Sequence, residues 1–213
     1  MAAGHLAEQV THFGHITTGF LGTPIICPVL SETGNDSLAY MLLNRKEYPS
    51  WLYPVTRGAT TIWERWDGIK PDSSFQTVGM NSFNHYAYGA IGRWLYATVA
   101  GIKIDESHPG FKRVILAPHP GGGLDSARAT YRSPYGEIFS GWRIIGATMR
   151  YHIQVPPNSG AHVVLPLVGS GTVLADGKDI HELAGMRNVS AGKGSISFDL
   201  GSGTHMFTYR MAK

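Results

Sequence analysis

Two carboxylates and two tryptophans lie together in the short stretch Trp63-Glu64-Arg65-Trp66-Asp67. The apolar face of a pyranose packs on an indole ring, while polar side chains bind the hydroxyl groups of the sugar. Carboxyl groups in such a site accept hydrogen bonds from those hydroxyls, or act as acid and base in glycoside hydrolysis. The stretch therefore indicates a carbohydrate site. The same run is also typical of a packed surface anchor with an internal ion pair.

Glu64 is the best candidate for a catalytic residue in this stretch. The indole rings on both sides would shield its carboxylate from water, while the neighbouring Arg65 would favour its charged form. A general base must stay ionised and yet be able to take a proton from water. Trp51, Trp94 and His85 come from other segments, and taken alone they are most simply interpreted as core residues.

The stretch falls in a long connection, residues 48–80, that holds three tryptophans and three prolines. Connections longer than about 15 residues are uncommon in compact domains and are usually functional or disordered. Disordered segments are poor in aromatic residues. We therefore expect an ordered, working loop.

Three helices are expected around this loop. Gly22-Thr23-Pro24 places a proline at the first helical position and predicts a helix to about residue 31. The N-cap cluster Asn35-Asp36-Ser37 predicts a second helix through Leu43. A third and longer helix is expected from about residue 82 to Gly101. It is apolar over much of its surface, which predicts burial on most sides.

The pattern changes near residue 109 to an alternation of apolar and polar residues, which predicts β-strands. Turn-forming residues separate the runs, and seven or more short strands at this spacing predict an antiparallel β-sandwich. The strands are expected at residues 113–116, 127–131, 138–142, 149–155, 162–165, 195–200 and 205–209. The chain is thus predicted to be an α+β protein with two domains, residues 1–108 and 109–213.

Composition excludes several kinds of partner and cofactor. Charged residues make up 15% of the chain, its formal net charge is +3, and no basic run occurs, so no nucleic-acid partner is expected. The single cysteine, Cys27, lies in an apolar run and is expected to be a buried, inert thiol. The ten histidines lack the spacing of a zinc motif, so neither a metal nor a cofactor is expected.

The N-terminal residues show no signal peptide, and no stretch approaches the roughly 20 apolar residues that span a bilayer. We therefore expect no membrane partner and a cytoplasmic location for the residues as given; a longer form of the protein could be located elsewhere. Helical domains usually contain more helices than residues 1–108 supply, and the apolar third helix needs partners to bury it. We infer that this part belongs to a larger helical domain whose other helices lie upstream.

The chain resembles the bacterial α-L-rhamnosidases of glycoside hydrolase family 78 over nearly its whole length. Trp63-Glu64-Arg65-Trp66 and Asn81-Ser82-Phe83-Asn84-His85 carry the resemblance around the candidate site. No single motif is decisive, but the matching stretches follow one another in a consistent order. They are residues 15–23, 30–32, 38–40, 48–51, 58–66, 80–89, 109–111 and 133–136.

The resemblance implies a fold and a role for four residues. The family's catalytic domain is an (α/α)6 barrel followed by a C-terminal β-sandwich, so this chain would hold the last helices of the barrel and the sandwich. The family hydrolyses terminal α-L-rhamnose with inversion, by a general acid and a general base. The resemblance assigns the base to Glu64 and a contact with rhamnose to His85, and it places Trp51 and Trp63 in the same pocket.

The resemblance also implies that the general acid and most of the acidic rhamnose-binding residues would lie upstream of Met1. The isolated chain is therefore expected to have little or no activity. Its expected partners are a rhamnose-containing glycoside and either a missing N-terminal half or a second copy of the chain. The alternative is a non-catalytic carbohydrate-binding or assembly fragment whose working part is the sandwich.

Overall fold

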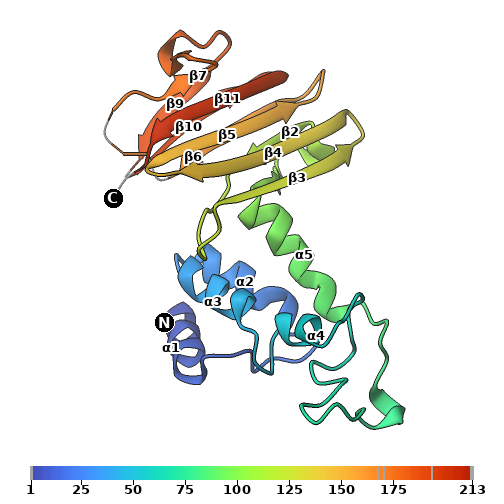
Figure 1. Ribbon diagram of the computed structural model, residues 1–213. Helices are drawn as coiled ribbons and strands as arrows, with labels where there is room; N and C mark the ends of the chain where they lie inside the picture. The colour runs from blue at the N-terminus through green and yellow to red at the C-terminus, as the bar shows by residue number, and fades with distance from the viewer. Residues whose placement is uncertain (1, 167, 170, 193, 212–213) are drawn as a thin grey trace. The chain divides into compact units, whose positions relative to one another are not determined.

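The computed structural model describes residues 2–166, 168–169, 171–192 and 194–211. The chain divides into two compact units, of which the first ends at Trp94 and the second begins at Leu95. The first unit is helical and the second is built mainly of β-strands (Figure 1). The domain boundary that the change of periodicity predicts, after residue 108, stays a prediction.

The first unit contains two of the expected helices, the first part of the third, and two helices that the sequence did not predict. The expected helices at residues 23–31 and 35–43 are confirmed, while the helices at residues 2–13 and 52–56 were missed. Asn35 does not cap its helix through its side chain, which instead donates to the carbonyl oxygen of Thr33 at 3.1 Å. The helices are α1 (Ala2–Phe13), α2 (Thr23–Glu32), α3 (Asp36–Asn44) and α4 (Leu52–Thr56). Among the described residues, no helix has both the length and the hydrophobicity needed to cross a membrane.

The third expected helix begins later than predicted. Its helical run covers residues 87–99, and is made of η2 (Ala87–Ala90), α5 (Ile91–Trp94) and η3 (Leu95–Val99). Residues 82–86 stay outside the helix because their backbone groups pair with the preceding loop. The carbonyl oxygen of Ser82 accepts from the amide of Glu64, and the amide of His85 donates to the carbonyl oxygen of Ile62.

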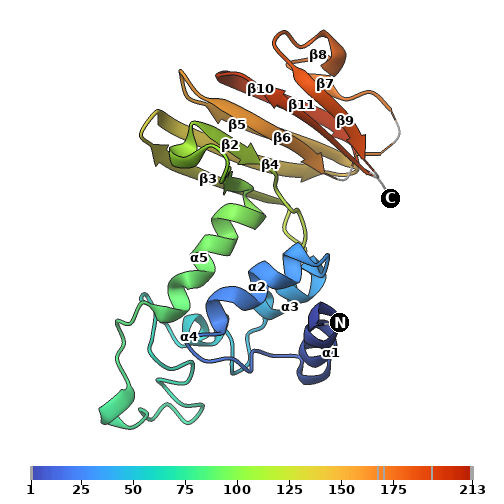
Figure 2. The same ribbon diagram turned by 180° about the vertical axis from the view of Figure 1, so that it is seen from behind.

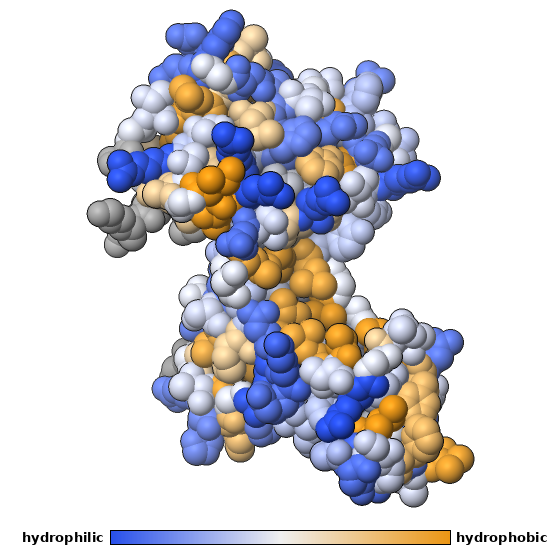
Figure 3. Space-filling model, in the orientation of Figure 1, coloured by the Kyte–Doolittle hydropathy of each residue, from blue (hydrophilic) through white to orange (hydrophobic). Residues whose placement is uncertain are grey.

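Burial of this helical run is also less complete than the sequence predicted. Trp94 and Val99 are buried, but the side chains of Leu95 and Tyr96 are 36% and 46% exposed. Figure 3 shows apolar side chains at the surface over this run. No described segment covers Leu95 and Tyr96, in keeping with the expectation that this helix needs partners that residues 1–108 do not supply.

The core of the helical unit forms around Trp94. Its indole nitrogen donates to the hydroxyl of Ser31 in α2 at 2.9 Å, and its ring meets Tyr40 of α3 edge to face at 5.1 Å. Leu30 and Leu42 are fully buried beside these contacts. The indole nitrogen thus has a hydrogen-bond partner inside the core, as buried tryptophans generally require.

The second unit consists of two sheets. The five-stranded sheet has the order β1-β2-β6-β10-β9 and the six-stranded sheet the order β3-β4-β5-β11-β7-β8. All seven predicted strands are present; the β2–β6 pair is parallel and the other pairs are antiparallel. The strands are β1 (Ile102–Ile104), β2 (Arg113–Leu116), β3 (Ser126–Ser133), β4 (Gly136–Ile145), β5 (Thr148–Val155), β6 (Gly160–Pro166), β7 (Leu174–Ala175), β8 (Lys178–Asp179), β9 (Arg187–Gly192), β10 (Ser195–Leu200) and β11 (Gly203–Arg210).

The two sheets pack face to face (Figure 2). Alternate residues of the central strands are buried, as expected where one face of each sheet meets the core. Phe198 of β10 and Phe207 of β11 are both fully buried, and their ring centroids lie 5.4 Å apart across the two layers. The predicted sandwich is therefore confirmed.

The end of the helical run is bound to the sandwich by side chains of β4. The indole nitrogen of Trp142 donates to the carbonyl oxygen of Val99 at 2.7 Å. The hydroxyl of Ser140 donates to the carbonyl oxygen of Ala100 at 2.5 Å. The last carbonyl groups of a helix have no partner within the helix, so a buried helix end needs donors from elsewhere. β4 supplies two of them.

Ser140→Ala tests this contact. The substitution removes one hydroxyl from a fully buried site and leaves the carbonyl oxygen of Ala100 without that donor. We expect the free energy of unfolding to fall by about 1–3 kcal/mol in urea denaturation. Ser190→Ala on the exposed strand β9 is the matched control and should change it by less than about 0.5 kcal/mol. Equal effects of the two substitutions would contradict the role of Ser140.

A charged network lies on the five-stranded sheet around Asp199. One carboxylate oxygen of Asp199 accepts from Arg113 at 2.5 Å and lies 2.8 Å from the ring nitrogen Nδ1 of His162, and the other accepts from Asn188 at 2.6 Å. Burial alone raises the pKa of the Asp199 carboxyl. The hydrogen bonds from Asn188, His162 and Arg113 outweigh burial and hold that pKa below its ordinary value of 3.8.

This shift predicts how stability depends on pH. Because the folded pKa of Asp199 is lower than the unfolded one, its carboxylate stabilises the fold above pH 3.8, and this contribution is lost as the pH falls through the folded value. Asp199→Asn should therefore lower the free energy of unfolding at pH 7 and flatten its decline below pH 3.8. Urea denaturation between pH 7 and pH 3 measures both effects. Asp125→Asn, at an exposed carboxylate, should leave the dependence of the unfolding free energy on pH unchanged. If the curve for Asp199→Asn ran parallel to that of the unaltered chain, the stabilising role of the Asp199 carboxylate would be refuted.

Candidate functional site

The loop that carries Glu64 folds back against the segment that precedes the helical run. The amide of Glu64 donates to the carbonyl oxygen of Ser82 at 2.8 Å, and the amide of His85 donates to that of Ile62 at 2.8 Å. The hydroxyl of Thr61 also donates to the carbonyl oxygen of Phe83. These bonds place residues 61–64 beside residues 82–85. Two of the predicted site residues, Glu64 and His85, are thereby brought into neighbouring segments.

The carboxylate of Glu64 is held by one backbone group. Its oxygen Oε2 accepts a hydrogen bond from the amide of Ser82 at 2.8 Å. The side chain is half-buried, and Oε1 has no hydrogen bond to any described residue. A hydrogen bond to a charged acceptor fixes its orientation strongly, so one oxygen of Glu64 is anchored while the other can still bind.

Arg65 pairs with a different carboxylate than the sequence suggests. The Nε atom of Arg65 lies 3.2 Å from Oδ1 of Asp67. The other carboxylate oxygen, Oδ2, accepts from the side-chain amide of Gln76 at 2.5 Å. Asp67 is therefore committed to holding the loop together. The expected effect of Arg65 on Glu64 is not seen as a contact, and no described cation pairs with Glu64.

His85 has one ring nitrogen engaged and one available. The amide of Ala87 donates to Nδ1 at 3.3 Å, which assigns the proton of the neutral ring to Nε2. The imidazole stacks on Phe20 at 4.9 Å with an angle of 18° between the planes, and on Tyr86 at 5.6 Å with an angle of 2°. The half-buried ring is thus held in place with a donor, Nε2–H, for a ligand.

The two predicted tryptophans are packed into the loop. Trp63 is 5% exposed and meets Phe83 edge to face at 5.0 Å. Trp51 is 8% exposed, and its indole nitrogen donates to the carbonyl oxygen of Tyr88 at 2.9 Å. Both indoles therefore contribute mainly to packing, and their contact with a sugar stays a prediction.

The site contains residues that reasoning from residue types and spacing did not find. Tyr88 stacks on Trp66 at 3.7 Å with an angle of 13°, and Trp66 in turn meets Trp51 edge to face at 5.6 Å. Phe20 reaches His85 from a segment far upstream in the sequence. Local spacing carries no signal for such contacts, because the tertiary fold creates them.

Metal chemistry has no ligand set in this part of the chain. Among the described residues, no cluster of three or more histidine, cysteine, aspartate or glutamate side chains could hold an ion. Cys27 is buried, and desolvation raises the pKa of its thiol to about 12. The thiol therefore stays protonated and unreactive at neutral pH, as the sequence predicted.

Tyr88→Ala tests whether ring stacking orders the loop. It removes the ring that covers Trp66 but keeps the backbone carbonyl that binds Trp51. We expect the loop to open more often, so that trypsin cleaves after Arg65 at least about tenfold faster while the sandwich stays intact. Val78→Ala, at a side chain 96% exposed on the same loop, is the control and should leave the rate unchanged. Equal cleavage rates for both variants would show that the stack does not hold the loop.

Two family models match consecutive parts of the chain. The first, described as bacterial α-L-rhamnosidase 6 hairpin glycosidase domain, matches residues 1–99. The second, described as bacterial α-L-rhamnosidase C-terminal domain, matches residues 101–178. Glu64 and His85 both fall within the region that the glycosidase-domain model matches.

Curated relatives carry the same description. An α-L-rhamnosidase of Streptomyces avermitilis is 45% identical over 194 residues, which cover 91% of this chain and 18% of that protein. An α-L-rhamnosidase of Formosa agariphila is 41% identical over 207 residues, which cover 97% of this chain and 22% of that protein. The chain therefore spans about a fifth of the length of these relatives.

Solved structures agree with the sequence relatives. One is the crystal structure of Streptomyces avermitilis α-L-rhamnosidase complexed with L-rhamnose, with a sequence identity of 42% and a TM-score of 0.87. The match covers 98% of this chain and 19% of that chain. The crystal structure of the Aspergillus terreus α-L-rhamnosidase has a sequence identity of 34% and a TM-score of 0.83. The match covers 100% of this chain and 22% of that chain.

Proposed function

The chain belongs to the bacterial α-L-rhamnosidases, as part of their C-terminal portion, and we propose that Glu64 is the general base of a hydrolase of terminal α-L-rhamnose. The observation that carries the proposal is the setting of the Glu64 carboxylate. One oxygen is fixed by the amide of Ser82, the other is uncommitted, and the neighbouring cation is occupied by Asp67. A carboxylate that is oriented but not neutralised by an ion pair can bind a water molecule and take its proton.

In the proposed reaction, Glu64 takes a proton from water as the water oxygen attacks the anomeric carbon. The glycosidic oxygen leaves with a proton from a general acid, so the configuration at the anomeric carbon inverts. Inverting enzymes keep the two carboxyl groups about 6.5–9.5 Å apart, which leaves room for that water. We place the general acid in the part of the relatives that this chain does not span.

His85 and the aromatic residues would bind the sugar. The Nε2–H of His85 can donate to a rhamnose hydroxyl, since Nδ1 already accepts from Ala87. Trp51 and Trp63 would line the pocket when the upstream part of the barrel completes it. The exposed Leu95 marks apolar surface that such partner helices, or a second copy of the chain, would cover.

Glu64→Gln in the complete protein tests the proposal. Glutamine keeps an oxygen to accept from the amide of Ser82 but cannot take a proton from water. We expect kcat for release of a chromophore from an aryl α-L-rhamnoside to fall by about 10²–10⁴-fold with little change in KM. The exposed Glu106→Gln should retain full activity.

A Glu64→Gln activity within about twofold of the unaltered protein would refute the role of Glu64. The chain of 213 residues assayed alone should release no more chromophore than the Glu64→Gln protein, because it lacks the proposed acid. Robust turnover by the chain alone would contradict the assignment of the acid to the upstream part. Binding of rhamnose without hydrolysis by the chain of 213 residues would favour the alternative, a non-catalytic carbohydrate-binding or assembly fragment whose working part is the sandwich.

A further inference from the structure

The outer face of the six-stranded sheet concentrates positive charge. Outward-facing residues alternate with buried ones along β4, β5 and part of β11, and the strand register continues the outward face onto the edge strand β3. These strands carry five arginines and a single carboxylate, Glu137. The arginines are Arg128, Arg132, Arg143, Arg150 and Arg210. Three of them line a hollow of about 640 Å³ on this face, namely Arg128, Arg143 and Arg150.

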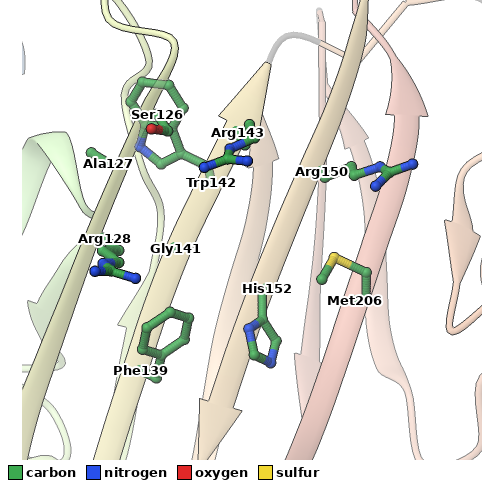
Figure 4. Close-up of a pocket in the computed structure, with 10 residues that line it drawn as sticks. All are labelled: Ser126, Ala127, Arg128, Phe139, Gly141, Trp142, Arg143, Arg150, His152 and Met206. Atoms are coloured by element: carbon green, nitrogen blue, oxygen red, sulfur yellow. The ribbon is translucent and has the colours of Figure 1, made fainter. Parts of the chain in front are cut away.

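The strand register shows how the hollow is built. Arg128, Gly141 and His152 lie opposite one another on β3, β4 and β5, while Arg143 lies opposite Arg150 in the next row. Arg128 therefore stands two strands and one row away from Arg150, about 12 Å between Cα atoms at the usual strand spacing and rise per residue. Figure 4 shows the two arginine side chains on either side of Phe139 and His152.

Gly141 forms the floor of the hollow. A Cβ atom at this position would lie 2.8 Å from Cζ of Phe139 and 3.2 Å from Cβ of Arg128. The glycine thus allows the ring of Phe139 to lie down against the sheet. That ring also meets the imidazole of His152 with 4.9 Å between centroids and an angle of 53°. The floor is therefore partly aromatic, and arginines stand at its margins.

The arginines of the hollow have no carboxylate partner among the described residues. Like charges directly opposite on neighbouring strands are destabilising, and Arg143 faces Arg150 in this way. Within the described residues, none of the ion pairs includes Arg128, Arg143 or Arg150. The nearby Asp176 already binds His205 and the amide of Met206. An external anion would remove this repulsion.

We propose that this hollow binds an acidic oligosaccharide through its carboxylate or sulfate groups. The planar fork of a guanidinium binds both kinds of oxyanion with two parallel hydrogen bonds. The rings of Phe139 and His152 offer a surface on which the apolar face of a sugar packs. Because Arg128 and Arg150 stand apart, two acidic groups of one chain can be bound at once. The choice of a carbohydrate over another polyanion rests on the proposed function.

Binding to the whole chain of 213 residues tests the inference without depending on hydrolysis. Two pairs of ligands are titrated by calorimetry at 50 mM salt, each made of an acidic member and a neutral counterpart. The first pair is tetragalacturonate and its methyl ester, and the second is a sulfated oligosaccharide and its unsulfated form. We expect one acidic member to bind with a dissociation constant below 1 mM and its neutral counterpart at least tenfold more weakly. The acidic member that binds more tightly identifies carboxylate or sulfate as the preferred group.

The matched variants separate a built site from general charge attraction. Arg143→Gln combined with Arg150→Gln should weaken binding at least tenfold, with far-ultraviolet circular dichroism unchanged. Arg132→Gln combined with Arg187→Gln removes the same charge outside the hollow and should change binding less than twofold. Absence of binding by both acidic oligosaccharides, or equal losses in the two double variants, would overturn the inference. Equal or tighter binding of hexaglutamate or oligothymidylate would overturn it as well, because the face would then respond to charge alone.

Discussion

The stacking of Trp66 on Tyr88 at 3.7 Å joins the loop around Glu64 to the helical run. A segment with few regular hydrogen bonds has no repeating backbone to define its shape, so ring burial must offset the entropy lost on ordering it. Tyr88 also accepts a hydrogen bond from Trp51 and belongs to the first turn of the helical run. One residue therefore links α4, the loop and that helical run.

The same loop distributes its charges so that the two carboxylates differ in character. Asp67 binds Arg65 and the side-chain amide of Gln76, whereas Glu64 accepts from one backbone amide and pairs with no cation among the described residues. Both oxygens of Asp67 are therefore engaged by side chains of the loop, whereas one oxygen of Glu64 can still bind a water molecule. The adjacent residues Glu64 and Arg65 suggest such a pair in the sequence, but the turn of the chain directs the guanidinium to Asp67.

Much of the fold could be predicted from the sequence, because its signals are local. Alternation and turn residues located the seven main strands, Pro24 located α2, and the resemblance to rhamnosidases with a six-hairpin domain and a C-terminal domain is confirmed. The start of the third helix was misplaced because residues 82–86 use their backbone groups in the loop. The short strands β7 to β9, the parallel β2–β6 pair and the stacking of Phe20 on His85 depend on tertiary contacts that no local pattern encodes.

The hydrogen bonds from Trp142 and Ser140 to the carbonyl oxygens of Val99 and Ala100 bear on how the two parts can be exchanged between proteins. The last turn of the helical run takes its hydrogen-bond donors from β4, and so it belongs to the sandwich in physical terms. A chimera joined at the loop after residue 104 would separate those carbonyl groups from their donors. A chimera that keeps both parts folded should instead be joined within the helix, between Trp94 and Leu95. The sandwich is then transferred together with the helix end whose carbonyl groups it binds.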